Sequence, residues 1–200
     1  MNLISTIAVA MGASWTSGIN LYASVATLGL LGRFAHLKLP GELDIVTNWW
    51  VIGIATALYC IEFFADKVPW IDSTWDVIHT FIRVPAGAVL AAVAFGDFDK
   101  SIQVIAVLVG GGLALSSHGT KAATRVLLNT SPEPVSNWVA SIIEDIVAVF
   151  SIVAAVFLPF LLFAIVAVGL LISYLVLPRI LRFFRAVISS VRKFKLSLST

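Results

Sequence analysis

Long uncharged stretches alternate with short polar loops along most of this chain. The first stretch, residues 2–32, has no charged residue, although a transmembrane helix needs only about 20 apolar residues. Residues 101–128 form a similarly long segment that stays uncharged as far as residue 117. Both segments have centres rich in Gly and Ser, "MGASWTSGIN" and "VGGGLALSSHG". This pattern predicts two membrane helices that are interrupted near their middle.

Three further stretches complete the pattern. Residues 49–65 form an apolar span that begins with tryptophans, which favour the membrane interface. Residues 75–95 carry charges in their first half, and the apolar remainder, residues 84–95, is too short to cross alone. This segment is either a full helix with a polar inner half or a re-entrant hairpin. Residues 138–177 would make about 60 Å of helix, twice the hydrocarbon core, so the chain must turn, and Pro159 is the candidate position.

Composition settles the class. Hydrophobic residues make up 60% of the chain and charged residues 12%. In soluble domains about 45–50% of the residues are apolar and about 25% are charged. The alternating pattern of an outer-membrane barrel is absent from the sequence. The first basic residue is Arg33, so no charged region marks a cleavable signal peptide, and the single Cys60 gives no disulfide framework. We therefore expect an all-α polytopic membrane protein with about six transmembrane segments.

The chain divides into two similar halves and a tail. We expect a membrane domain over residues 1–177, with halves of about 1–97 and 98–177, and a basic amphipathic tail over residues 178–200. Each half opens with a long helix rich in small residues, followed by a proline-containing loop and a tryptophan, in "TNWWV" and "SNWV". Because each half has three segments, the halves have opposite orientations. Inverted repeats with interrupted first helices are typical of transporters, but Gly and Ser also simply allow close helix packing.

The tail suggests how the protein lies in the membrane. It carries six basic residues, which by the positive-inside rule place the C-terminus in the cytoplasm. With six spans the N-terminus of this multi-pass protein would be cytoplasmic too. In a membrane protein a basic tail binds anionic lipid more often than nucleic acid, so we expect membrane lipids as partners and no nucleic acid.

Charged residues gather at one end of the predicted spans. His118, Lys121 and Arg125 have the spacing i, i+3, i+7, which places them on one helical face. Charges near the bilayer centre cost at least about 2.5–3.5 kcal/mol, so such groups face a cavity or one another. We expect one charged vestibule that opens to the cytoplasm. Its candidate residues are Glu62, Asp66, Asp76, His79, Arg83, His118, Lys121, Arg125, Glu144 and Asp145.

Several functions remain open for these residues. They could form a self-neutralising network that holds the bundle together, or bind an ion or an anionic headgroup. His118 beside Ser116 and Ser117, with Asp145, could also be drawn as a catalytic triad, but no nucleophile elbow supports it. No metal-ligand spacing or cofactor motif occurs, so we expect neither a metal nor a cofactor and do not favour an enzyme.

The leading hypothesis is a small transporter or channel for an ion or an anionic solute or lipid headgroup. A homodimer is expected, because 200 residues provide little wall for a complete pathway. The alternative is a non-transporting scaffold or lipid-organising protein, and an intramembrane enzyme acting on a lipid phosphate is the third hypothesis. One observation counts against transport: the outer half offers only Asn20, Tyr22, Ser24 and Thr27 as polar groups.

Two segments of the chain resemble a known family. They are "EFFADKVPWIDSTWDVIHTFIRVPAGAVLAA" (Glu62 to Ala92) and "HGTKAATRVLLNTSPEPVSNWVASIIEDIVA" (His118 to Ala148). Together with "SGINLYASVATLGLLGR" they resemble a bacterial membrane-protein family catalogued as domain of unknown function 4126. The resemblance covers residues from about 10 to 160. It implies an integral protein of the bacterial cytoplasmic membrane and brings no established activity.

Overall fold

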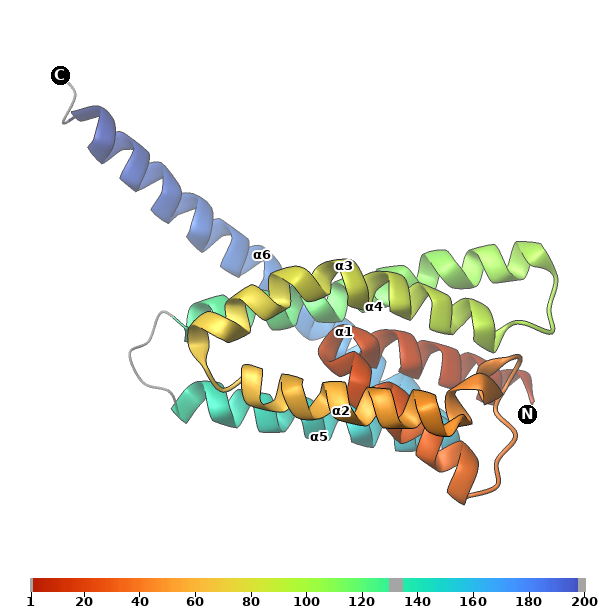
Figure 1. The fold of residues 1–200 in the computed structure, drawn as a ribbon. Coiled ribbons are helices and arrows are strands. Elements are labelled where there is room, and N and C mark those ends of the chain that lie inside the picture. The colour runs from red at the N-terminus through yellow and green to blue at the C-terminus, as the bar shows by residue number, and fades with distance from the viewer. Residues whose placement is uncertain (1, 130–134, 198–200) are drawn as a thin grey trace.

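The computed structural model describes residues 2–129 and 135–197, and within these ranges the protein is entirely helical. The helices run back and forth along one common direction to form a bundle, and only α6 extends beyond it (Figure 1). The elements are α1 (Leu3–Phe34), the short 3-10 helix η1 (Leu43–Thr47), α2 (Trp49–Ala65), α3 (Pro69–Ala94), α4 (Lys100–Leu128), α5 (Val135–Phe157) and α6 (Pro159–Ser197).

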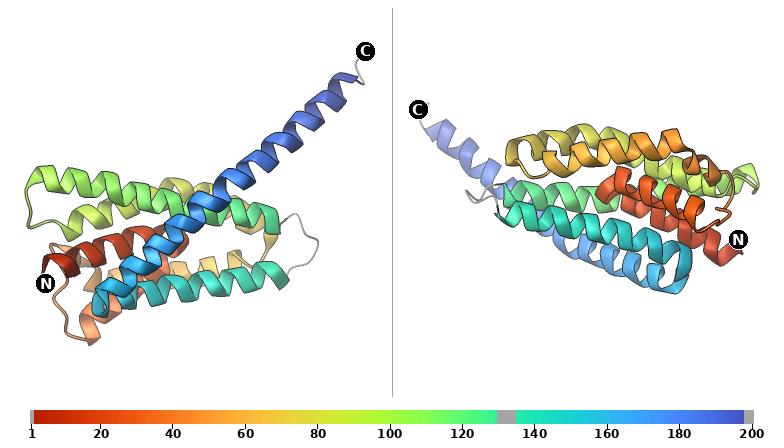
Figure 2. Two further views of the ribbon diagram at one scale, coloured as in Figure 1. Left: turned by 180° about the vertical axis from the view of Figure 1, so that it is seen from behind. Right: turned by 60° about the horizontal axis from the view of Figure 1, so that its bottom comes forward.

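Helix α1 folds back on itself at Asn20. The backbone of this residue (φ −147°, ψ 97°) is not helical, and a helix runs on each side of it. The two halves are about 25 Å and about 21 Å long, shorter than a hydrocarbon core of about 30 Å. The first half packs beside the end of α3 and the start of α4, and the second half ends beside η1 and the start of α2. The predicted interruption is therefore confirmed, and it makes α1 a re-entrant helical hairpin (Figures 1 and 2).

Helix α4 runs without a break from Lys100 to Leu128, so the prediction that it is interrupted is wrong. Its small residues allow close packing instead. A Cβ on Gly110 would come within 2.5 Å of the Ala91 Cβ, and one on Gly87 would come within 2.6 Å of the Ala114 Cβ. The helix-packing alternative therefore holds for this segment. Helix α3 is also continuous in spite of Pro85, which makes it a full helix with a polar first half.

The chain turns at Pro159, as predicted. Helix α5 ends at Phe157 and α6 begins at Pro159, where the missing N–H of proline suits the first turn of a helix. Within the described residues, four helices, α3 to α6, contain stretches long and apolar enough to cross a membrane, and α2 is a shorter apolar helix. Large hydrophobic side chains such as Phe81, Leu108 and Phe160 point outward and are exposed. The protein is thus a multi-pass α-helical membrane protein.

Helix α1 begins at one end of the bundle and α6 leaves it at the other (Figure 1). The fold-back of α1 accounts for this arrangement, because the second half of α1 returns toward the end at which the helix began. Helix α6 continues through Pro178 as far as Ser197. The apolar face predicted for the tail involves residues 181 and 183–197, which lie outside the described side chains.

Candidate functional site

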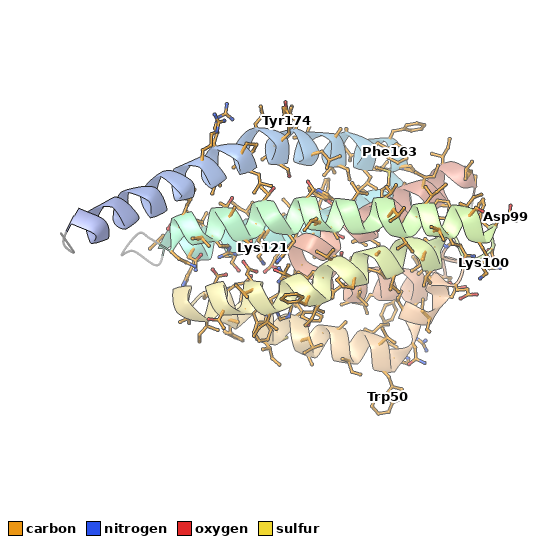
Figure 3. All side chains as sticks on the ribbon, turned by 90° about the horizontal axis from the view of Figure 1, so that it is seen from above. Trp50, Asp99, Lys100, Lys121, Phe163 and Tyr174 are labelled. Atoms are coloured by element: carbon orange, nitrogen blue, oxygen red, sulfur yellow. The ribbon has the colours of Figure 1, made fainter. Side chains whose placement is uncertain are left out.

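The buried charged residues occupy the half of the bundle away from the α3–α4 loop. Figure 3 shows Lys121 far along α4 from Asp99 and Lys100, which lie beside that loop. The sequence-predicted residues come from four helices, and apart from Glu144 they are buried. We call the following set the charge cluster: Glu62, Asp66, Asp72, Asp76, Arg83, Lys121, Arg125, Glu144 and Asp145.

Arg83 links α3 to α2. Its Nη2 atom lies 2.8 Å from Oε1 of Glu62, and its Nη1 atom lies 3.3 Å from Oδ1 of Asp76. The Arg83 and Glu62 side chains are both fully buried. An unpaired charge in such a place would be very costly, so these ion pairs are a condition for the helices to pack as they do.

Arg125 is the most highly connected side chain of the charge cluster. Its guanidinium holds both carboxylate oxygens of Glu144, with Nε at 3.1 Å from Oε1 and Nη2 against Oε2. Nη1 donates to the Asn137 side chain at 2.6 Å and to the Asp66 carbonyl at 3.3 Å. Asp72 lies 3.7 Å away. Arg125 therefore joins α4 to α5 and to the connection between α2 and α3, using the fork geometry of a guanidinium.

Lys121 points toward three carboxylates and the fold-back of α1. Its Nζ atom lies 3.0 Å from Asp66, 3.4 Å from Glu144 and 3.8 Å from Glu62. The same ammonium donates at 3.1 Å to the carbonyl of Ile19, which ends the first half of α1 and carries the negative end of its dipole. Burial alone would raise the pKa of the Asp66 carboxyl, but Lys121 and Arg125 outweigh this effect and hold that pKa below its ordinary value.

Both predicted histidines take part in hydrogen bonds that define their tautomers. Thr80 donates its only proton to the Asp76 carbonyl, so Nε2 of His118 donates to Thr80 at 2.7 Å and Nδ1 accepts from Arg83 at 3.4 Å. His79 donates from Nδ1 to the Trp75 carbonyl, and its Nε2 accepts from the Tyr22 hydroxyl at 3.0 Å. The imidazoles are thereby placed as neutral links between helices.

Asp145 is the carboxylate of the charge cluster that has only neutral partners. Its Oδ1 accepts from the Asn20 amide at 2.8 Å and its Oδ2 from the Tyr59 hydroxyl at 3.3 Å. No basic group lies within ion-pair distance of it in the described ranges. Asn20 also caps the second half of α1, because its Oδ1 accepts from the Ala23 amide. The fold-back of α1 and this buried carboxylate are thus directly connected.

Negative charge exceeds positive charge in the charge cluster. Six carboxylates face three basic side chains, which gives a formal charge of −3 when all are ionised. Burial raises the pKa of Asp72, in the first turn of α3, to about 6, although Arg125 opposes this effect. Among the described residues, at least one oxygen on each of four buried carboxylates lacks a hydrogen-bond partner; these are Glu62, Asp66, Asp72 and Asp76. The cluster therefore has unused acceptors, which attract protons or cations.

The geometry does not favour a metal site or a catalytic triad. In the described part of the chain, no group of three or more Asp, Glu, His or Cys is arranged to hold a metal ion. The residues of the triad considered above are engaged separately: Ser117 donates to the Trp15 carbonyl at 2.6 Å, His118 bonds Thr80, and Asp145 bonds Asn20. The three side chains thus have different partners, two on α1 and one on α3.

Sequence reasoning missed several residues of the site. Asp72 lies four residues before Asp76, so the helical spacing could have found it. Asn20 is one of the polar groups predicted for the outer half, whereas the structure places it against Asp145. It carries the one side-chain amide of the "MGASWTSGIN" segment, and such a side chain favours caps and turns. Asn137, which accepts from Arg125 and donates to the Asp66 carbonyl at 3.1 Å, lies in the motif "SNWV" without any charge to attract notice.

These features define an all-α multi-pass membrane protein with a buried, acid-rich polar interior at one end of its bundle. The chain belongs to the family described as "Domain of unknown function (DUF4126)", whose sequence model matches residues 7–179. The family resemblance seen in the sequence is thereby confirmed over a wider range. No curated protein and no solved structure matches the chain significantly.

Proposed function

We propose that the protein is a small secondary transporter that uses proton binding at Asp145 to drive the movement of a solute. The observation that carries this proposal is a buried carboxylate with no basic group within 4.0 Å in the described structure, hydrogen-bonded to the break of a helix that folds back. An ionised carboxylate in such surroundings is costly, so the group binds a proton or a cation instead. Interrupted helices carry the ion-coupling sites of many transporters.

The acid surplus of the charge cluster favours a cationic over an anionic solute. Each of the three basic side chains already contacts at least two carboxylates within 4.0 Å. An anion entering the cluster would compete with these carboxylates and meet unpaired acceptor oxygens. This narrows the expectation from the sequence, which allowed an anionic solute or headgroup.

In this proposal the end of the bundle that holds the charge cluster faces the cytoplasm of the inner membrane, because the basic tail leaves the bundle there (Figure 1). The N-terminus then faces the opposite side. Contact of the tail with anionic lipid and assembly into a homodimer belong to the same proposal, whereas an inverted repeat would require α1 to cross the membrane. Anionic vesicles should retain the full chain better than a chain that ends at residue 182.

Proton flux in proteoliposomes tests the proposal. With potassium and valinomycin clamping the potential and a quaternary ammonium solute added, the protein should dissipate an imposed pH gradient, because proton movement is coupled to that of the cationic solute. Asp145→Asn should abolish this activity. Asp99→Asn is the matched control, because Asp99 is exposed beside the α3–α4 loop. Absence of flux from the folded wild-type protein, or full flux from Asp145→Asn, would refute the proposal.

The second candidate function is a scaffold without transport. Its support is the apolar half of the bundle, where the hairpin of α1 fills the interior with buried residues such as Ala8, Val9 and Leu28. Transport requires α1 to move out of this position. A wild-type protein that binds lipid, remains folded and gives no proton flux would support the scaffold.

A further inference from the structure

A groove opens on the side of the bundle between α4, α5 and α6. It has a volume of about 570 Å³, which is within the range of about 300–1,000 Å³ for ligand sites. It forms because α6 crosses the bundle obliquely (Figure 2). Helix α6 lies close to α1 at Gly169, where a Cβ would collide with the Trp15 ring. Beyond this crossing α6 stays bonded to α4 through Ser173 and Thr120, and it diverges from α5, which leaves the groove open on that side (Figure 2).

The walls of the groove are apolar and its floor is polar. Side chains such as Ile143, Val147, Ile165 and Val168 form the walls. The floor contains Thr120, Thr124 and Ser173 together with two members of the charge cluster, Lys121 and Glu144. Glu144 is the more accessible of these two, with 17% of its side chain exposed against 2% for Lys121. A ligand suited to this groove has an apolar body and a polar end.

The charged residues at the floor of the groove determine which charge the polar end of a ligand would carry. Lys121 is the basic residue of the lining, and it already contacts Asp66, Glu144 and Glu62 within 4.0 Å. It is therefore not free to hold a phosphate or a carboxylate. Behind it lies the acid surplus of the charge cluster, whose field attracts cations. Trp15 adds an aromatic ring to the lining, and an aromatic face stabilises an ammonium or phosphonium group.

We infer that this groove is a binding site for lipophilic organic cations, molecules with an apolar body and an amine or quaternary cationic centre. The inference rests on the proposed transport function and names the class of its solute. A molecule of this kind partitions into the membrane and enters the groove sideways between α5 and α6, because α4 and α6 are joined by the hydrogen bond between Thr120 and Ser173. Its charge then lies near Glu144 and the ring of Trp15, within the electrostatic field of the charge cluster.

Equilibrium binding to the full-length protein in a neutral detergent tests this inference. The probes are tetraphenylphosphonium and tetraphenylborate, which have nearly the same shape and opposite charge. The phosphonium should bind, and the borate should bind at least about tenfold more weakly. A protein that binds neither probe, or that binds the borate as tightly as the phosphonium, would overturn the inference.

A pair of tryptophan substitutions locates the site. Val168→Trp fills the groove, whereas Leu171→Trp adds the same bulk to α6 at a residue outside the lining. Both positions are 56% exposed, so neither change disturbs the core. Val168→Trp should weaken phosphonium binding by about tenfold or more, and Leu171→Trp should leave it unchanged. Equal effects of the two substitutions would place the binding elsewhere and refute the inference. Because binding is measured without flux, lost binding with intact proton flux rejects the groove and not the proposed transport.

Discussion

The ion pair between Arg83 and Glu62 offers the most direct test of how the charge cluster holds the bundle together. Both side chains are fully buried, with Nη2 and Oε1 separated by 2.8 Å, and they come from different helices, α3 and α2. Arg83→Met keeps an unbranched apolar side chain and removes the guanidinium group. Among the described residues it leaves Glu62 with Lys121, at 3.8 Å, as its one basic partner, and it removes the contact to Asp76.

The expected cost follows from this geometry. Removing one member of a buried ion pair destabilises a protein by about 3–5 kcal/mol, because the partner is left charged and unsolvated. We expect Arg83→Met to fall in this range. The double variant Arg83→Met/Glu62→Gln removes the stranded charge of Glu62, so it should be more stable than the single variant by about 0.5–3 kcal/mol. Recovery is incomplete because Asp76 and His118 still lose a partner.

Reversible unfolding in mixed detergent micelles, followed by tryptophan fluorescence, measures these free energies. Lys100→Met is the control, since Lys100 is exposed, and its stability should change by no more than about 0.5 kcal/mol. A cost below about 1 kcal/mol for Arg83→Met, or a double variant no more stable than the single one, would show that the pair is not needed for packing.

Three further predictions follow from other parts of the structure. Gly18→Ala should destabilise the protein by about 1–3 kcal/mol, because its Cβ would come within 2.8 Å of the His118 amide, whereas Gly112→Ala, with open space around it, should be neutral or stabilising. Asp72→Asn should raise the melting temperature at pH 7.5 and change it little at pH 4. The pKa of Asp72 is raised from 3.8 to about 6 in the folded protein, so the stability of the wild-type protein falls as the pH rises from about 4 to about 6. In a Cys60→Ser background, cysteines placed at Ser5 and Arg182 should react with impermeant reagents from opposite sides of the membrane.

Each of these predictions has an outcome that contradicts it. A Gly18→Ala protein as stable as Gly112→Ala would mean that α1 and α4 do not pack as closely as the structure has them. If Asp72→Asn had the same effect at both pH values, the folded state would not hold the Asp72 proton more tightly than the unfolded state does. Labelling of both cysteines from one side would mean that α1 crosses the membrane instead of folding back.

Helical spacing explains why much of the site could be predicted from the sequence. The residues His118, Lys121 and Arg125 recur at i, i+3, i+7, so one face of α4 had to present all three, whatever the rest of the fold. The cost of burying charge then required carboxylates opposite them. Pro159 could be predicted as the turn between α5 and α6 because the apolar segment was too long to be one crossing.

Small residues account for the main error. The centres of α1 and α4 have similar compositions, yet only α1 is interrupted. A glycine permits either an irregular backbone or a close approach of another helix, and composition alone does not distinguish them. In α4 the deciding factor lies on another helix, where Ala91 occupies the space beside Gly110. In α1 it is the amide of Asn20, which satisfies the broken backbone and also bonds Asp145 on α5. Both deciding contacts are distant in sequence.

The same contacts explain how a change at the charge cluster would reach the rest of the molecule. The fold-back of α1 is held from one side by Lys121, which bonds the Ile19 carbonyl, and from the other by Asp145, which bonds the Asn20 amide. A proton on Asp145 weakens its hydrogen bond to that amide, because the bond is then no longer assisted by charge. The bond between Lys121 and Ile19 remains, so the two halves of α1 are affected unequally. The second half of α1 packs against η1 and α2 at the end of the bundle opposite the charge cluster. Binding of one proton at Asp145 would therefore change how α1 packs at that opposite end. A hairpin anchored at its tip is therefore a physical link between the two ends, and a transporter needs such a link.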